Sequence, residues 1–111
     1  MKTERAFQQV CNLEEIPRNT GVCALVGGKQ VAIYRIGEEN CLYAMDNYDP
    51  FSKANVLSRG IVGSKDGTPK VASPIYKQQF NLETGECLDD PNTSLQVYEV
   101  REQDGKVFVG M

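Results

Sequence analysis

The chain has 111 residues, 41% of them hydrophobic and 24% charged, and this size and composition predict one domain over residues 1–111. The net charge of −3 argues against a nucleic acid as partner. No apolar run near the start resembles a signal peptide and none elsewhere could span a bilayer, so we expect a cytoplasmic protein that binds no membrane.

Short strands and turns account for the first part of the chain. Residues 7–12 form the first predicted strand. Two apolar, partly β-branched runs, residues 21–26 and 30–36, flank Gly27-Gly28. Strand patterns on both sides of a Gly-Gly pair are typical of a β-hairpin. Residues 41–45 form the next predicted strand.

The regular pattern disappears between residues 46 and 67, a segment rich in Asp, Asn, Ser, Pro and Gly. A loop of this length inside a compact domain is often functional. We expect its apolar residues to anchor it to the core, and these are Val56, Leu57, Ile61 and Val62. Helix is sparse, with a single turn expected at Glu14-Glu15 or at residues 55–59.

Strand patterns return at residues 70–72 and 79–82. The chain then ends in a second predicted hairpin, in which residues 95–101 and 106–109 flank the turn Gln103-Asp104-Gly105. Many short strands separated by turns predict an all-β sandwich or small barrel.

The four cysteines lie far apart without a C-x-x-C pair. In a reducing cytosol we interpret them as free thiols packed as small apolar groups, in preference to two disulfides or a zinc site. The chain contains no histidine, which excludes Ser–His and Cys–His catalysis. We therefore predict no catalytic and no cofactor-binding residues in this chain, and no catalysis by the chain alone. The four cysteines are Cys11, Cys23, Cys41 and Cys87.

Charge is distributed unevenly along the sequence. Between residues 50 and 82 there are five basic residues and one acidic residue, a local charge of +4, so the remainder carries −7. This basic region could steer a partner to one end of the molecule or only keep long loops soluble. The basic residues are Lys53, Arg59, Lys65, Lys70 and Lys77.

Four stretches taken in order resemble the iron–sulfur domain of Rieske proteins. They are residues 47–51 (Asn-Tyr-Asp-Pro-Phe), 57–60 (Leu-Ser-Arg-Gly), 72–76 (Ala-Ser-Pro-Ile-Tyr) and 80–87 (Phe-Asn-Leu-Glu-Thr-Gly-Glu-Cys). The Phe-x-Leu-x-Thr-Gly run in the last of these is the most specific. The resemblance implies a Rieske-like (ISP-type) fold of small antiparallel sheets, with a part that resembles the cluster-binding subdomain at about residues 46–91.

A Rieske centre is held by two Cys thiolates and two His imidazoles. The resemblance places Asp49 and Ser73 on the two Cys positions and Phe51 and Tyr76 on the two His positions. None of these side chains offers a thiolate or an imidazole, so we predict no metal site in this chain.

A fuller pattern adds Val56, Lys77-Gln78 and the run 88–91 (Leu-Asp-Asp-Pro) to these stretches. It resembles one subgroup, the small subunits of cytoplasmic NAD(P)H-dependent assimilatory nitrite reductases. That resemblance implies a non-catalytic subunit of an oxidoreductase that reduces nitrite to ammonia in nitrate assimilation. Its partner would be the large catalytic subunit, which would carry FAD, siroheme and an iron–sulfur cluster. Two alternatives remain from the sequence: a Rieske-type, ferredoxin-like electron-transfer protein, and a stand-alone protein-binding module.

The substituted ligand positions have two possible roles. Phe51 and Tyr76 could fill the space of a cluster by packing, or could stay partly exposed as aromatic anchors for a partner. The second role predicts an interface at this end of the molecule. Its candidate residues are Pro50, Phe51, Lys53, Arg59, Pro74, Tyr76 and Lys77.

Overall fold

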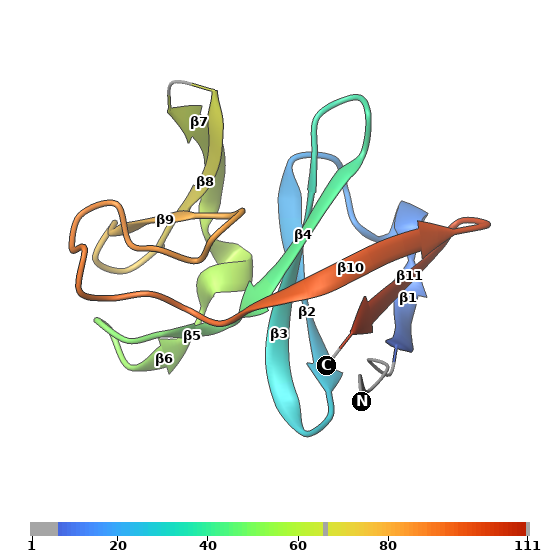
Figure 1. Ribbon diagram of the computed structural model, residues 1–111, viewed down its shortest axis with the longest axis horizontal. Coiled ribbons are helices and arrows are strands. Elements are labelled where there is room, and N and C mark those ends of the chain that lie inside the picture. Colours follow the sequence, from blue (N-terminus) through green and yellow to red (C-terminus); the bar gives the residue numbers. More distant parts are fainter. Residues whose placement is uncertain (1–6, 66, 111) are drawn as a thin grey trace, which may run out of the picture.

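A computed structural model describes residues 7–65 and 67–110, which contain eleven β-strands in three antiparallel sheets and two short 3-10 turns (Figure 1). The fold is all-β, as predicted, and a helical turn forms at both places that the sequence indicated. The elements are β1 (Phe7–Asn12), η1 (Leu13–Glu15), β2 (Thr20–Val26), β3 (Lys29–Ile36), β4 (Cys41–Asp46), β5 (Tyr48–Asp49), β6 (Ala54–Asn55), η2 (Leu57–Arg59), β7 (Ile61–Lys65), β8 (Thr68–Ala72), β9 (Gln79–Asn81), β10 (Val97–Gln103) and β11 (Lys106–Gly110).

The larger sheet has six strands in the order β1-β11-β10-β4-β3-β2, and its two edge strands contact each other. The sheet therefore curves round on itself. Both predicted hairpins are confirmed, β2–β3 and β10–β11. Gly27 and Gly28 have φ of 57° and 84°, and Asp104 and Gly105 have φ of 54° and 77°. Two positive φ angles in a row give the turn whose twist matches that of paired strands, which is why these sequences form hairpins.

A smaller part of the fold projects from one side of this sheet and contains the β5–β6 pair and the sheet β7-β8-β9 (Figure 1). Strand β7 was not predicted, because its Gly63-Ser64-Lys65 end lacks a strand pattern. The expected anchors are only partly correct. Leu57 is fully buried and Val62 packs against the core, whereas Ile61 is 66% exposed.

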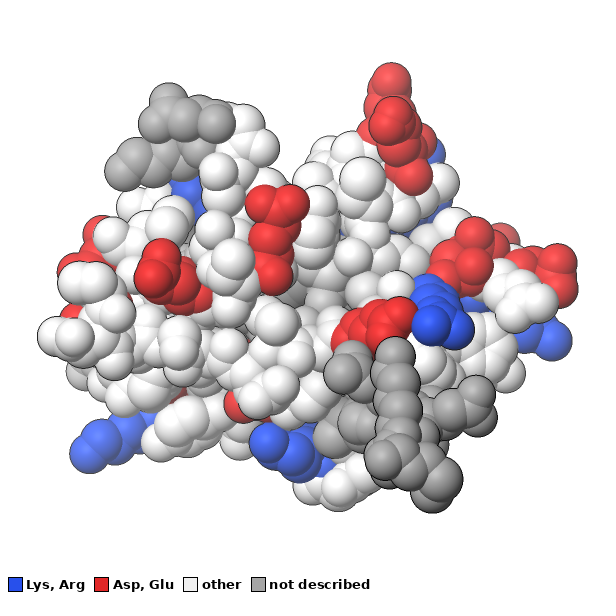
Figure 2. Space-filling model, in the orientation of Figure 1, with Lys and Arg blue, Asp and Glu red and all other residues white. Residues whose placement is uncertain are grey.

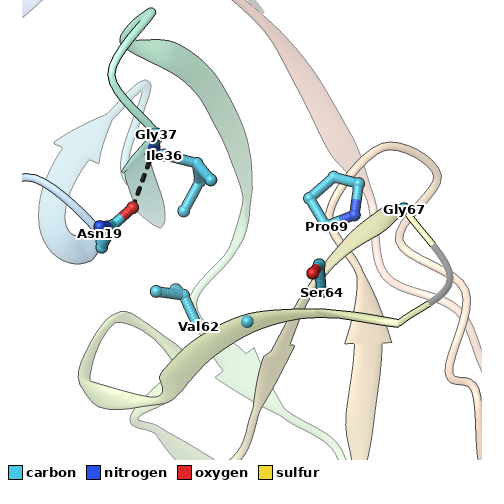
Figure 3. Close-up of a pocket in the computed structure, with 8 residues that line it drawn as sticks. Asn19, Ile36, Gly37, Val62, Ser64, Gly67 and Pro69 are labelled. Atoms are coloured by element: carbon cyan, nitrogen blue, oxygen red, sulfur yellow. Dashed lines mark hydrogen bonds between the residues drawn. The ribbon is translucent and has the colours of Figure 1, made fainter.

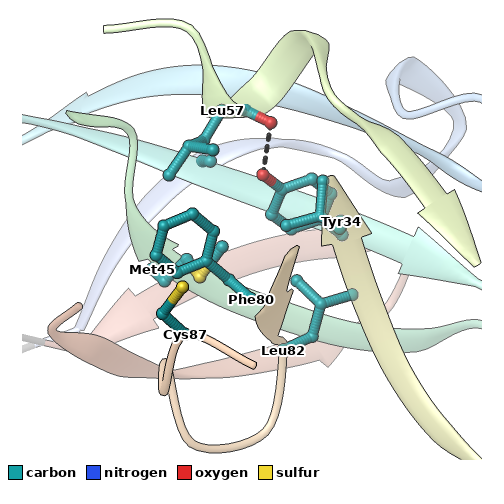
Figure 4. Packing of buried hydrophobic residues seen from close by; sticks show 8 residues of the cluster. Tyr34, Met45, Leu57, Phe80, Leu82 and Cys87 are labelled. Atoms are coloured by element: carbon teal, nitrogen blue, oxygen red, sulfur yellow. Dashed lines mark hydrogen bonds between the residues drawn. The ribbon is translucent and has the colours of Figure 1, made fainter. Parts of the chain in front are cut away.

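One of two core clusters joins the two parts of the fold, and Figure 4 shows it at close range. Tyr34 reaches out of β3 and donates a hydrogen bond to the carbonyl oxygen of Leu57 in η2 at 2.5 Å. Gly21 makes room for this ring, since a Cβ there would lie 2.6 Å from it. The cluster therefore fixes the smaller part against the sheet. Its buried members are Ala32, Tyr34, Met45, Leu57, Val71, Phe80, Leu82 and Cys87.

The cysteines are free thiols, as predicted, but only one of them serves as a buried apolar group. Cys87 is 1% exposed and belongs to the core, and Cys11 is half-buried. Cys23 and Cys41 are exposed, so the packing prediction is wrong for these two. Cys23 pairs with Ala32 and Cys41 pairs with Ile36, so both lie on the sheet face that carries the cluster, but at positions left open to solvent. Among the described residues, no helix is long and apolar enough to cross a membrane.

Candidate functional site

Two five-residue loops carry the positions that the resemblance assigned to metal ligands. We call residues 49–53, which connect β5 to β6, the first tip loop, and residues 73–77, between β8 and β9, the second tip loop. Each begins with a buried polar residue, Asp49 or Ser73, and each continues with a proline. The structure therefore brings the predicted ligand positions to one end of the smaller part of the fold.

The first residues of the two loops contact each other directly. The hydroxyl of Ser73 donates a hydrogen bond of 2.5 Å to Oδ2 of Asp49, and the two residues are 1% and 0% exposed. The residues lie 24 positions apart in the sequence. This contact ties the loops together at the two positions that the resemblance assigned to thiolate ligands.

The Asp49 carboxylate has further donors inside its own loop. The Phe51 amide donates to Oδ1 at 2.9 Å, and the Ser52 hydroxyl donates to Oδ2 at 2.8 Å. Burial disfavours the charged carboxylate, but the hydrogen bonds from Ser73, Phe51 and Ser52 outweigh burial, and the pKa of Asp49 is lowered. Asp49 is therefore a charged, fully hydrogen-bonded group at the base of both loops.

The second tip loop repeats the geometry of the first. The amide of Ile75 donates to the Ser73 hydroxyl at 3.3 Å, as that of Phe51 does to Asp49. In each loop the amide of the fifth residue donates a hydrogen bond to the carbonyl oxygen of the first residue. The distance is 2.7 Å from Lys53 and 3.2 Å from Lys77. The two loops are thus matched structures, although their sequences share only the proline and the final lysine.

This arrangement does not fit a Rieske cluster. Iron needs thiolate and imidazole donors, and Phe51 has no donor atom while Ser73 and Tyr76 offer only hydroxyls. Asp49 and Ser73 bind each other, so neither is free to face a metal. Within residues 7–65 and 67–110, no group of three or more His, Cys, Asp and Glu side chains is placed to hold a metal ion.

The two aromatic residues at the His positions have different roles. The Phe51 ring lies 6.2 Å from the Phe80 ring, between centroids, and packs against the core cluster. Tyr76 is 60% exposed, and its neighbour Ile75 is 47% exposed. Phe51 therefore fills space, while Tyr76 and Ile75 present apolar surface to solvent. The sequence left both roles open for both rings.

Arg59 lies apart from the tip loops. It is the last residue of η2 and lines a groove with Thr20, Gly21 and Ile61, beside the larger sheet. Of the predicted interface residues, the structure brings Pro50, Phe51, Lys53, Pro74, Tyr76 and Lys77 together in the tip loops and places Arg59 in this groove.

The groove extends into a cavity of about 450 Å³ between the end of β3 and the β7–β8 hairpin (Figure 3). Asn19 closes one side, where its Oδ1 accepts a hydrogen bond of 2.9 Å from the Gly37 amide. The other lining residues are glycines and the side chains of Ile36, Val62, Ser64 and Pro69. Among the described residues, its lining includes no acidic or basic side chain.

Sequence reasoning missed the Asp49–Ser73 contact and the exposure of Ile75. A signal for the matched loops is present, because both segments read polar–Pro–x–x–Lys. A proline after a short polar residue favours a turn. The pairing of the two loops has no such local signal.

Known proteins share this fold along almost the whole chain. The family described as Rieske-like [2Fe-2S] domain matches residues 6–110. A crystal structure of an NADH-dependent nitrite reductase small subunit from Mycobacterium tuberculosis superposes with a TM-score of 0.92 at 40% identity. The alignment covers 98% of this chain and 97% of that one.

Two curated relatives differ greatly in length. The small subunit of nitrite reductase (NADH) from Salmonella typhimurium is 45% identical over 101 residues, which cover 91% of this chain and 94% of that subunit. The nitrite reductase [NAD(P)H] large subunit of Klebsiella oxytoca is 42% identical over 106 residues. That match covers 96% of this chain but 11% of the Klebsiella protein, so the chain corresponds to a small part of that protein.

Proposed function

This chain belongs to the family of Rieske-like [2Fe-2S] domains and, within it, to the small subunits of NADH-dependent nitrite reductase, and from this we propose that it is the non-catalytic small subunit of a cytoplasmic NAD(P)H nitrite reductase. The enzyme reduces nitrite to ammonia in nitrate assimilation. The chain supports or regulates the large subunit, which carries the FAD, siroheme and iron–sulfur cluster.

The contact between Asp49 and Ser73 is the observation that carries this proposal. Two loops that hold a metal in related domains here hold each other, through a buried hydrogen bond of 2.5 Å. In this chain the two loops are tethered by a side-chain hydrogen bond, and positions 49, 51, 73 and 76 carry no thiolate or imidazole. A role in binding is therefore better supported than electron transfer through this chain.

The Klebsiella match supports the large subunit as partner. There a segment similar to this chain occurs within a polypeptide named as the large subunit, whereas in Salmonella the similar protein is a separate small subunit. A domain joined to a protein in one organism is held beside it at high effective concentration. The separate form has to reach the same neighbour by binding.

The tip loops are the proposed interface with the large subunit. Ile75 and Tyr76 form an exposed apolar pair on the second loop, and exposed aromatic residues are frequent anchors at interfaces. Phe51 contributes from beneath by packing on Phe80 and supporting the first loop. Arg59 stands outside this surface, in the groove beside the larger sheet.

Co-purification and activity measurements test the proposal. The large subunit of the same organism is produced with and without this chain, and NAD(P)H-dependent nitrite reduction is measured for each preparation and for this chain alone. We expect a stable complex, activity or stability of the large subunit that depends on the chain, and no turnover by the chain alone. Absence of a complex together with unchanged activity and stability of the large subunit would exclude the proposed role.

A further inference from the structure

The backbone angles single out two lysines. Eleven described residues have a positive φ, and six of these are glycines. Three of the others are Asn or Asp, whose short polar side chains tolerate this region best among non-glycine residues. The remaining two are Lys53, with φ of 58°, and Lys77, with φ of 68°.

A lysine is a poor choice at such a position for stability. Its Cβ crowds the backbone in the left-handed region, and its long side chain cannot compensate by a local hydrogen bond as Asn can. Elsewhere in the described chain, positions with this geometry hold Gly, Asn or Asp. Strained backbone that a better residue would relieve is a reason to look for a function of the side chain.

Both lysines occupy the same place in the two matched loops. Each is the fifth residue of its loop, and its amide donates a hydrogen bond to the carbonyl oxygen of Asp49 or Ser73. Because those two residues are hydrogen bonded to each other, Lys53 and Lys77 leave the same end of the molecule. In Figure 2, basic side-chain atoms extend from the lower left edge, on the side where Figure 1 draws β5 and β6.

Neither ammonium group is neutralised within the described residues. Both lysines are exposed, and neither side chain takes part in an ion pair or hydrogen bond there. The carboxylate of the tip loops, Asp49, is buried and already accepts hydrogen bonds from Ser73, Ser52 and the Phe51 amide. The tip therefore presents two free positive charges next to exposed apolar residues.

We propose that Lys53 and Lys77 bind carboxylates on an acidic surface of the large subunit, on either side of a pocket that receives Tyr76 and Ile75. This inference rests on the proposed function and names the chemistry of its partner surface. Paired ammonium groups beside an apolar anchor select an acidic partner, because covering an unpaired charge at an interface is unfavourable.

The test measures two properties of each variant, the stability of the chain and its binding to the large subunit. The double variant K53G/K77G removes both charges and relieves both left-handed positions, while K53R/K77R keeps the charges on the same backbone. The matched control, R18Q/K106Q, removes two exposed positive charges outside the tip loops. The dissociation constant with the full-length large subunit is measured for each at low and high salt, and the melting temperature is measured for each chain alone.

We expect K53G/K77G to keep or raise the melting temperature and to weaken binding by about tenfold or more at low salt, with a smaller loss at high salt. We expect K53R/K77R and R18Q/K106Q to bind like the unmodified chain. Wild-type affinity in K53G/K77G, or a marked fall in its melting temperature, overturns the inference and leaves the proposed function standing. If the unmodified chain does not bind the large subunit, both are wrong.

Discussion

Ser73 and Asp49, at the base of two loops, share a hydrogen bond of 2.5 Å that is almost completely shielded from water. A Rieske centre is held by two Cys and two His side chains, whereas here a hydroxyl and a carboxylate tie the two loops together. A hydrogen bond to a buried charged group is among the stronger ones in proteins. The contact therefore holds the two tip loops together through their first residues.

Removing the hydroxyl should loosen the tip. We expect Ser73→Ala to lower the free energy of unfolding by about 1.5–3 kcal/mol, because the buried carboxylate of Asp49 then lacks one of its donors. Denaturant titration measures this change. Ser64→Ala is the matched control, since Ser64 is exposed on β7, and it should change stability by no more than about 0.5 kcal/mol. Equal effects of the two changes would mean that the contact does not stabilise the fold.

Acid should weaken the same contact. Burial raises the pKa of Asp49, but its hydrogen bonds lower the pKa by more than burial raises it. The folded pKa of Asp49 therefore lies below its unfolded pKa. The stabilisation is therefore fully present above the unfolded pKa and is lost as the pH falls through the folded pKa. Unfolding is measured from about pH 6 to about pH 2 for the unmodified chain and for Asp49→Asn. The stability difference between them should shrink as the pH falls, and a constant difference would contradict the prediction.

Phe51 and Tyr76 should respond differently to truncation. Phe51→Ala removes a ring that packs against Phe80, and we expect a loss of about 2–3 kcal/mol in stability. Tyr76→Ala removes a ring that is 60% exposed, so its stability should change by less than about 0.5 kcal/mol. The same Tyr76 variant should bind the large subunit more weakly. Titration calorimetry and denaturant unfolding of both variants provide the comparison, and a stability loss in Tyr76→Ala would assign Tyr76 to the core instead.

The glycine of the Phe-x-Leu-x-Thr-Gly run should be irreplaceable for a steric reason. Gly85 has φ of 83°, and a Cβ there would lie 2.1 Å from the carbonyl oxygen of Leu95. We expect Gly85→Ala to lower stability by about 3 kcal/mol or more, or to prevent folding. Gly28→Ala is the control, because Gly28 has nearly the same φ of 84° with open space around it, and should lower stability by about 1 kcal/mol. Thermal unfolding of both variants separates the steric effect from the backbone effect.

The purified chain should be colourless. Its positions 49, 51, 73 and 76 offer no thiolate or imidazole, and Cys87, the cysteine of this half of the chain, is buried in the core. We expect no visible absorption of a [2Fe–2S] centre and no stoichiometric iron after anaerobic purification. Iron bound at a fixed ratio, with its colour, would instead support the ferredoxin-like alternative.

The sequence by itself determined the features whose causes are local. Gly27-Gly28 and Asp104-Gly105 specify hairpin turns through positive φ angles, and the strands beside them follow from their apolar, β-branched residues. The order of short motifs also indicated the family, and with it the expectation that positions 49, 51, 73 and 76 hold no metal ligand. These conclusions needed only neighbouring residues or a pattern along the chain.

The tertiary structure alone decided how the tip is held and what it exposes. Asp49 meets Ser73 across 24 positions of sequence, and Phe51 turns inward because Phe80 from β9 lies beneath it. Tyr76 stays in solvent on a loop of matching geometry. Strand β7 also depends on pairing with β8, because its Gly63-Ser64-Lys65 end has little preference for a strand. Contacts between segments that are distant in sequence leave no local pattern, so only the folded chain shows which of two equivalent aromatic positions is buried and which one is available to a partner.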